Sequence, residues 1–344
     1  MKLTDFDYYL PKELIAQQPL TNRDESRLLV LHRSDGRIED KVFRDIIEYL
    51  VPGDTLVLND TKVFPARLFG INGLKKVEIL LSKNHPDQVW EVLIKPARKV
   101  KIGAKLQFGD ELTGELIEKR GGYGFVKFEY EGDFFKILSK VGKLPLPHYI
   151  KRESNEADAE QYQTVYARHR GAIAAPTAGL HFTHQLLKKI QEKGVQLAYI
   201  TLHVGVGTFA PIRNEDVLEH QMEEEYYEIS SQAAEIINQT RGRIVVVGTT
   251  AVRALETVGK NPQSKIPNPK SKIFPCSGVT DLFIYPGFNF KVTDMLVTNF
   301  HLPKTTLLLL VSAFAGQERI LGAYQSAINK GYRFYSYGDA MLII

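Results

Sequence analysis

From Thr61 to about Arg152 the chain interrupts a regular alternation of strands and helices, and this interruption most constrains its fold. Within that window, short runs of alternating apolar residues are separated by turn signals such as Asn72-Gly73 and Gly121-Gly122. Several short strands at this spacing predict a small all-β barrel. On either side of the window, strands alternate with helices, which predicts βαβ units and a mainly parallel sheet.

The length of the chain fits this organisation. At ~100–200 residues per domain, 344 residues correspond to about two domains. We therefore expect an α/β fold with a mainly parallel sheet domain at residues 1–61 and 153–344. A small all-β barrel domain at residues 62–152 is inserted into it, so the α/β domain is discontinuous.

Three strand–loop–helix passages are expected in the α/β part. Their strands are Ala172–Ala175, Arg243–Val247 and Asp294–Thr298, and their helices are about His184–Lys193, Ala251–Val258 and Thr305–Ala315. Because an open α/β sheet places its ligand crevice at the carboxyl ends of parallel strands, the three connecting loops should meet at one edge. Residues Asn261–Lys272, rich in Pro, Asn, Lys and Ser, are expected to form a further loop.

The small net charge of +4 is unevenly distributed. Residues 62–152 hold 18 basic and 10 acidic side chains, whereas the rest of the chain holds 26 and 30. Five cations lie within eleven residues, near Trp90 and Phe108: Lys95, Arg98, Lys99, Lys101 and Lys105. Such a cluster favours RNA phosphates, and the aromatic rings could stack on exposed bases. The alternative is a solvated basic face whose aromatic residues belong to the barrel core.

The expected location is the cytoplasm. Cys276 is the single cysteine, which excludes an internal disulfide framework and fits a reducing compartment. The first residues are acidic and aromatic, unlike a secretory signal. The longest apolar run, from Leu307 to Phe314, is shorter than the ~18 residues of a membrane-spanning helix. No membrane partner is therefore expected.

Three histidines fall on the expected edge loops: His181, His203 and His301. One histidine alone is more often a core residue, but three at comparable positions favour a site. Imidazole suits zinc. Only His181-x-x-His184 has a short ligand spacing, however, so we expect no metal site.

The same loops carry groups that could hold a small polar ligand. Gly179 permits close backbone approach. Gly248-Thr249-Thr250 lacks the spaced glycines and lysine of a nucleotide fingerprint, yet its amides and hydroxyls could cradle a ribose or a carboxylate. Arg253 and Glu256, three residues apart on the next helix, are spaced to pair with each other.

Six segments of the sequence together resemble one known family. They are Leu58–Leu68, Ala174–Phe182, Leu202–Phe209, Val247–Thr250, Ile284–Gly287 and Leu296–Pro303. These segments resemble the S-adenosylmethionine:tRNA ribosyltransferase-isomerase family of queuosine biosynthesis. The similarity runs from Leu3 to Asp339, which is essentially the whole chain.

The resemblance implies an inserted β-barrel in a discontinuous α/β domain, and it implies a reaction. The ribosyl part of S-adenosylmethionine is transferred to preQ1 at the wobble position of a tRNA and isomerised, leaving epoxyqueuosine with release of adenine and methionine. The expected partners are this co-substrate and the preQ1-bearing tRNA. No permanently bound cofactor and no obligate protein partner are expected.

Such chemistry needs a general base and a general acid, which histidine supplies most readily. We expect His181, His203 and His301 to form this pool, with Asp281 or Glu224 holding an ammonium group or orienting an imidazole. The order of acid and base among the three histidines stays open. The expected substrate contacts are Asn59, Arg67, Thr177, Gly179, Thr249, Arg253 and Asn299, with Arg67 suited to a carboxylate or phosphate.

One position departs from the family pattern. Glu223 stands where the family, in its His-x-Met-His-x-Glu segment, often has a second histidine after His220. A mechanism that required this second histidine would not apply here, and we expect the position to be peripheral.

Two other functions remain open from the sequence. An S-adenosylmethionine-dependent RNA methyltransferase is disfavoured because no glycine-rich fingerprint follows the first strand of the α/β part. A non-catalytic RNA-binding module would use the barrel as its reader and keep the histidines structural. Release of adenine separates the ribosyl transfer from both.

Overall fold

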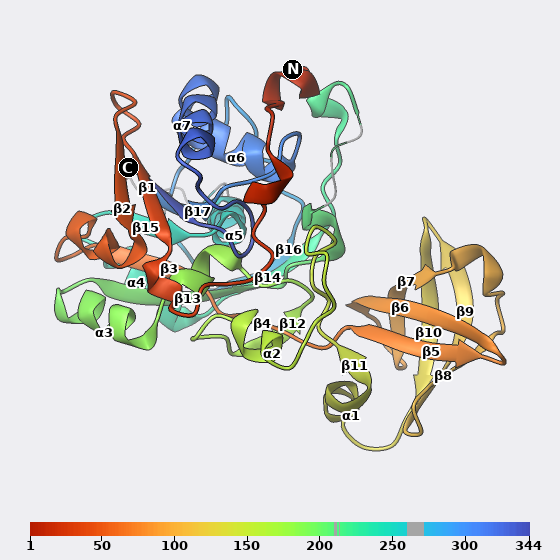
Figure 1. The fold of residues 1–344 in the computed structure, drawn as a ribbon. Coiled ribbons are helices and arrows are strands. Elements are labelled where there is room, and N and C mark those ends of the chain that lie inside the picture. Colours follow the sequence, from red (N-terminus) through yellow and green to blue (C-terminus); the bar gives the residue numbers. More distant parts are fainter. Residues whose placement is uncertain (210–211, 213, 260–271) are drawn as a thin grey trace.

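A large sheet covered by helices and a separate small barrel make up the computed structural model (Figure 1). It describes residues 1–209, 212, 214–259 and 272–344. The loop expected at Asn261–Lys272 therefore lies, apart from its last residue, outside the described residues.

The large sheet is mixed. Its described strands run in the order β16 (Cys276–Thr280), β14 (Glu225–Ile229), β13 (Gln196–Leu202), β3 (Thr55–Asn59), β15 (Ile244–Val247), β17 (Met295–Asn299), β18 (Ala340–Ile343), β1 (Arg27–Leu31) and β2 (Ile38–Val42). The central strands β13, β3, β15 and β17 are parallel to one another. Of the eight neighbouring pairs among these strands, four are antiparallel: β16–β14, β14–β13, β17–β18 and β1–β2.

The prediction of a mainly parallel sheet is therefore wrong beyond the centre. After β17 the chain forms two successive helices, α6 (Thr306–Ala315) and α7 (Gln317–Asn329), instead of one crossover helix. The second helix returns the chain to the edge of the sheet at which β17 ends. The next strand, β18, therefore runs antiparallel to β17. Within the described residues no single helix is long and apolar enough to cross a membrane, although α6 and α7, bent by 113°, pass that test of length and composition together.

The apolar strands send side chains to both faces of the sheet. In β15, Ile244 and Val246 belong to the core that includes α4 (Ser231–Asn238), α5 (Thr249–Gly259), α6 and α7. Val245 and Val247 belong to the opposite core, with α3 (His184–Glu192) and the 3₁₀ helices η4 (Phe43–Tyr49) and η6 (Thr177–His181). Burial on both faces explains a strand without polar alternation.

The inserted segment forms a closed barrel of six antiparallel strands, as expected. Their order is β5 (Arg67–Asn72), β6 (Lys75–Asn84), β7 (Val89–Lys95), β10 (Tyr123–Glu129), β9 (Leu112–Arg120) and β8 (Lys105–Phe108). Pairing of Ile71 with Gln107 joins β5 to β8 and closes the ring. A Cβ atom on Gly70 would lie 2.6 Å from the Phe108 ring, so glycine is needed for this close approach.

Two segments connect the barrel to the α/β body. Helix α1 (Phe134–Val141) and the short strand β11 (Gly142–Lys143) lead out of the barrel. On the way in, β4 (Thr61–Val63) pairs in parallel with β12 (His169–Ala172) in a separate two-stranded sheet. The strand expected at Ala172–Ala175 is thus shifted towards the N-terminus and lies outside the large sheet. The boundaries at 61/62 and 152/153 stay a prediction.

Asp54 ties together the amino ends of the central strands. Its buried carboxylate accepts hydrogen bonds from the Val51 amide (3.0 Å) and the Arg243 amide (2.8 Å) and lies 2.6 Å from Arg243 Nη2. Burial alone would raise the pKa of Asp54, but these hydrogen bonds outweigh it and hold the pKa below its usual value. The carboxylate form therefore contributes stability above the unfolded pKa and loses it as pH falls.

We predict that Asp54→Asn lowers the free energy of unfolding at pH 7 by about 3 kcal/mol, because it leaves a half-buried guanidinium without its partner. Urea denaturation measures this change. Glu48→Gln, which removes an exposed pair with Lys41 at 2.9 Å, should cost less than ~0.5 kcal/mol. Equal losses in the two variants would contradict the structural importance of the buried pair.

Candidate active site

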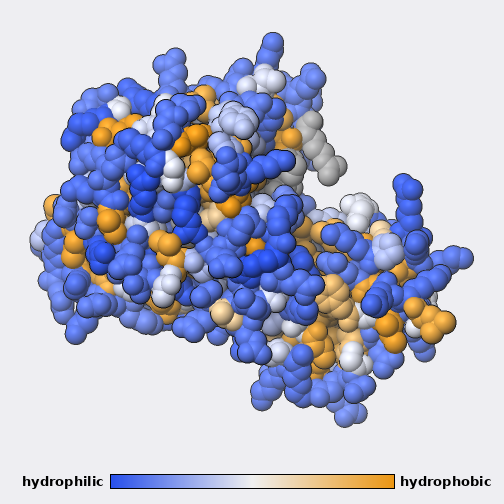
Figure 2. Space-filling model, in the orientation of Figure 1, coloured by the Kyte–Doolittle hydropathy of each residue, from blue (hydrophilic) through white to orange (hydrophobic). Residues whose placement is uncertain are grey.

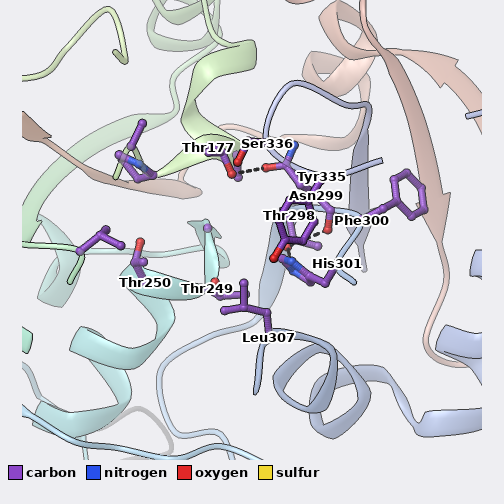
Figure 3. Close-up of a pocket in the computed structure, with 15 residues that line it drawn as sticks. Thr177, Thr249, Thr250, Thr298, Asn299, Phe300, His301, Leu307, Tyr335 and Ser336 are labelled. Carbon is purple, nitrogen blue, oxygen red and sulfur yellow. Dashed lines mark hydrogen bonds between the residues drawn. The ribbon is translucent and has the colours of Figure 1, made fainter. Parts of the chain in front are cut away.

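A small pocket lies at the carboxyl ends of β15 and β17. Its walls come from four segments distant in sequence: residues 175–178, 248–250, 298–301 and 335–336, with Val204 and Leu307. Figure 3 shows Thr177 and Asn299 pointing towards each other across one wall, with Thr249 and Leu307 on another. The predicted meeting of edge loops thus creates a cavity.

The polar walls of the pocket follow from strand endings. β15 ends at Val247, and Thr249 and Thr250 begin α5, so the N-terminus of this helix faces the pocket. Amides at a helix N-terminus favour anionic or polar groups. β17 ends in Asn299, and the chain then turns so that His301 joins the lining while the Phe300 ring points away (Figure 3).

His301 is the one predicted histidine in this pocket's lining. Its Nε2 lies 2.8 Å from Thr298 Oγ1, whose hydroxyl donates to the Asn299 carbonyl at 3.2 Å. With the Thr298 hydrogen donated to Asn299, the ring proton lies on Nε2 and the lone pair on Nδ1. Burial lowers the pKa of His301 to about 3, so the imidazole is neutral at pH 7 and a weaker base than free histidine.

His181 lies one hydrogen bond behind the pocket. Asn299 Nδ2 donates to His181 Nε2 at 3.1 Å, and His181 Nδ1 lies 2.7 Å from Ser26 Oγ. The ring is buried and stacks on Phe43. Both ring nitrogens are engaged, and the Asn299 oxygen in turn accepts from Thr177 at 2.8 Å. His181 therefore orients the two polar side chains that face the pocket.

Backbone strain is stored at the same pocket. Tyr335 has a φ of 75°, a conformation that costs a non-glycine residue about 1–3 kcal/mol. Its ring packs edge-on against Tyr149, with the two centroids 3.8 Å apart, and the Tyr149 hydroxyl contacts Ser336. Tyr149 belongs to the segment that returns from the barrel, so this segment supports the pocket.

A second cavity, a cleft of about 570 Å³, separates the barrel from the body. His203 lines it, and Val204 lines both cleft and pocket. His203 Nδ1 lies 2.7 Å from Thr61 Oγ1, which also lies 3.4 Å from the His169 carbonyl. With the Thr61 hydrogen donated to that carbonyl, Nε2 carries the free lone pair. Burial, reinforced by the charge of His169, lowers the pKa of His203 to about 4. This histidine is thus also neutral at pH 7.

Carboxylates from the run after His220 face the same cleft. Glu223 accepts hydrogen bonds from Tyr123 of the barrel (2.8 Å) and from the Gly207 amide (3.1 Å). Glu224 is exposed and lies 3.6 Å from Lys83 of the barrel. The unusual Glu223 is therefore a contact between barrel and body. Asp281 is exposed and is not part of the lining of either cavity.

Arg253 is buried in an ion pair, but with a different partner from the one its spacing suggested. Its guanidinium contacts Glu225 and donates to the carbonyls of Leu282 (3.0 Å) and Thr280 (3.2 Å). Glu256 instead accepts backbone hydrogen bonds from residues 291–293. Side-chain direction around the helix, which spacing alone does not give, separates Arg253 from Glu256. Arg253 also lines a third, very small cavity next to Thr249 and Thr250.

Three other residues that were predicted to contact the substrate instead contact other parts of the protein. Asn59 is buried and bonds to Leu202, Thr61 and Thr250. A Cβ on Gly179 would overlap the Tyr166 hydroxyl, so this glycine serves packing. Arg67 lies on the barrel, where it donates to the Leu146 carbonyl at 3.3 Å and approaches Glu78 at 3.6 Å.

The five predicted RNA-binding cations, Lys95, Arg98, Lys99, Lys101 and Lys105, are all exposed on the barrel. Trp90 and Phe108, however, belong to the barrel core. These two rings are therefore not available to stack on the bases of a bound RNA.

Sequence reasoning missed Thr298, Tyr335, Ser336 and Glu225. Thr298 and Glu225 lie on strands and look like ordinary sheet residues. Tyr335 and Ser336 precede β18 and reach the site only because this strand runs antiparallel to β17. No group of three or more His, Cys, Asp or Glu side chains that could hold a metal is found in the described part of the chain.

We predict that His181 makes stability depend on pH. Burial lowers its pKa to about 3, whereas the unfolded value is 6.5. The unfolded chain then binds the extra proton first, so stability is full above pH 6.5 and falls as pH drops towards 3. The loss from this residue should reach about 2 kcal/mol at pH 5. Urea denaturation of His181→Gln at pH 7 and 5 should show a correspondingly shallower dependence, and an unchanged one would contradict it.

Known proteins resemble this chain over essentially its whole length. A family model described as queuosine biosynthesis protein matches residues 3–343. The chain is 53% identical over 349 residues to an S-adenosylmethionine:tRNA ribosyltransferase-isomerase of Carboxydothermus hydrogenoformans, and 52% identical over 351 residues to one of Halothermothrix orenii, each covered completely on both sides. A crystal structure of S-adenosylmethionine tRNA ribosyltransferase from Thermotoga maritima is 40% identical, with 99% of this chain and 100% of that chain covered and a TM-score of 0.56. The chain therefore belongs to the S-adenosylmethionine:tRNA ribosyltransferase-isomerase family.

Proposed function

We propose that the protein transfers and isomerises the ribosyl moiety of S-adenosylmethionine onto preQ1 at the wobble position of tRNA. The products are epoxyqueuosine in the tRNA, adenine and methionine. The observation that carries this proposal is the pair of neutral histidines in adjoining cavities, His301 in the pocket and His203 in the cleft. Each has one ring nitrogen fixed by a threonine hydroxyl and the other available as a base.

We place the donor across two adjoining cavities. The pocket and the third cavity share Thr249, Thr250 and Leu307, so they adjoin. Two connected chambers suit a donor whose nucleoside and amino-acid halves meet at a sulfonium. The helix N-terminus at Thr249 offers amides for its carboxylate or ribose hydroxyls.

The chemistry assigns a different task to each histidine. The sulfonium acidifies the adjacent ribose carbon, and we assign removal of that proton to His301 Nδ1. The imidazolium so formed returns the proton to the departing adenine. The electron pair left on the deprotonated carbon opens the sugar ring by expelling the ring oxygen from C4′, and this oxygen, now an alkoxide on C1′, expels adenine and becomes an aldehyde. The preQ1 amine adds to C4′ of the resulting vinyl sulfonium, and His203 takes the proton that the amine gives up. The carbanion regenerated beside sulfur attacks the aldehyde carbon, and the alkoxide so formed closes the epoxide and expels methionine. His181 holds Asn299 and Thr177 in place.

The cleft suits the RNA substrate. It lies between the body and the basic barrel, and its carboxylates, Glu223 and Glu224, could attract the preQ1 ammonium. An enzyme that acts on tRNA is expected in the cytoplasm. We propose that it needs no permanently bound cofactor and no obligate protein partner.

We predict that His301→Asn and His203→Asn each lower the rate of adenine release by about 10²–10⁴-fold, the usual contribution of a general acid or base. The assay mixes protein, S-adenosylmethionine and preQ1-bearing tRNA and follows adenine together with the nucleoside mass. His184→Asn, at the exposed start of α3, is the matched control and should keep full activity. Unchanged turnover in both site variants would refute the assignment.

The wild-type assay also separates the alternative functions. Methyl label from the donor in the RNA would identify a methyltransferase. Binding of tRNA without adenine release would identify a non-catalytic RNA-binding module. Either result would overturn the proposed ribosyl transfer.

We further predict that charge reversal at Lys95, Lys99 and Lys101 weakens tRNA binding and flattens its salt dependence, because fewer counterions are released. Titrations of labelled tRNA at several salt concentrations measure both effects. Binding of S-adenosylmethionine, measured by calorimetry, should not change. A salt slope equal to that of wild type would show that RNA binds elsewhere.

A further inference from the structure

An unassigned groove of about 1000 Å³ crosses the outer face of the barrel, away from the cleft. Two apolar side chains of β5 form its floor: Phe69 is 50% exposed and Ile71 is 47% exposed. Figure 2 shows apolar side chains gathered among charged ones on the near face of the barrel. An aromatic ring left half-exposed on a strand has lost much of the stabilisation that burial would provide, which favours a binding role.

Strand register surrounds this ring with polar groups. Phe69 pairs with Glu78 of β6, which pairs with Lys95 of β7, so these three positions form one row across the sheet. Ile71 pairs with Lys76 on one side. Its partner on the other side is Gln107 of β8. The apolar floor thus has ammonium groups on its rim and an amide beside it.

The groove is lined by two lysines, Lys76 and Lys95, and by two carboxylates, Glu78 and Asp110. Glu78 approaches Arg67 at 3.6 Å, and Lys143, which pairs with Glu153 at 3.3 Å, places its ammonium 5.5 Å from the Phe69 ring centroid. Lys76 and Lys95 have no ion-pair partner among the described residues. An anion-bearing, flat and partly apolar ligand is complementary to such a surface.

We propose that this groove binds an unpaired nucleotide of the tRNA, with its base stacked on Phe69 and its phosphates held by Lys76 and Lys95. Stacking on an aromatic ring combined with lysine contacts is how proteins hold single-stranded nucleic acid without reading its sequence. Phe69 thereby takes the role that the sequence had suggested for Trp90 or Phe108, both of which are buried. The inference rests on the proposed tRNA substrate.

The groove and the cleft would hold different nucleotides of one RNA. Strand β6 contributes Lys76, Val77 and Glu78 to the groove and Ser82, Lys83 and Asn84 to the cleft. At ~3.3 Å per residue, the two sets lie about 20 Å apart. One base would enter the cleft for reaction, and a second, remote base would anchor the RNA.

Fluorescence anisotropy of a labelled anticodon stem-loop RNA tests the proposal. Phe69→Ala should weaken binding about tenfold or more, since base stacking is lost. Its salt slope should match wild type because no charge is removed, whereas Lys95→Gln should reduce that slope. Ile117→Ala, which truncates another exposed apolar residue of the barrel, is the matched control and should bind as wild type does.

Phe69→Trp keeps the measurement decisive if the alanine variant is unstable. The introduced indole should bind the RNA within about threefold of wild type, and stacking should quench its emission, whereas the emission of Ile117→Trp should not change. Equal RNA affinity of wild type and Phe69→Ala would overturn the proposal. A concentration-dependent dimer in sedimentation that Phe69→Ala abolishes would also overturn it, by assigning the groove to a second copy.

Adenine release by the wild type distinguishes a failure of the groove assignment from a failure of the proposed function. If the wild type releases adenine with preQ1-bearing tRNA and Phe69→Ala shows the same KM for this tRNA, the groove assignment alone fails. If the wild type releases none, the proposed function fails, and the stem-loop titration still decides whether the groove binds RNA.

Discussion

The carboxamide of Asn59 is the interaction on which the geometry of both cavities depends. At the end of β3 it donates to the Leu202 carbonyl (3.0 Å) and to Thr250 Oγ1 (3.2 Å), and it accepts from the amides of Leu202 (3.0 Å) and Thr61 (3.1 Å). One buried side chain therefore fixes the end of β13, the start of α5 and the turn into β4. Thr250 lines the pocket and Thr61 holds His203, so the amide couples pocket and cleft.

The three histidines differ through their hydrogen bonds more than through their burial. His181 uses both nitrogens within the protein, whereas His203 and His301 each use one and keep a lone pair on the other. Burial lowers the pKa of all three, to between about 3 and about 4, so none carries a positive charge at neutral pH. A neutral imidazole beside a sulfonium avoids charge repulsion and has a lone pair for a proton, although its lowered pKa makes it a weaker base than free histidine. The protein thus leaves one ring nitrogen free on two of the histidines and uses the third for support.

Local patterns in the sequence predicted much of this fold. The features that they did not predict depend on tertiary contacts. The inserted barrel, the helices α3, α5 and α6, and the convergence of edge loops followed from periodicity and turn residues. The antiparallel return of β18 did not, because two helices in succession give the same local pattern as two separate crossovers. That return brings Tyr335 and Ser336 to the pocket. Likewise, the sequence cannot tell whether Asn59 or Arg253 faces a substrate or a partner such as Glu225.

The account stands on the pocket between β15 and β17 being the donor site. A crystal structure of the protein with S-adenosylhomocysteine, an analogue that lacks the reactive sulfonium, tests this most directly. We expect its ribose within hydrogen-bonding distance of Thr249 or Thr250, and the carbon next to sulfur facing His301 Nδ1. Ligand density confined to another cavity, with this pocket empty at saturating ligand, would contradict the account.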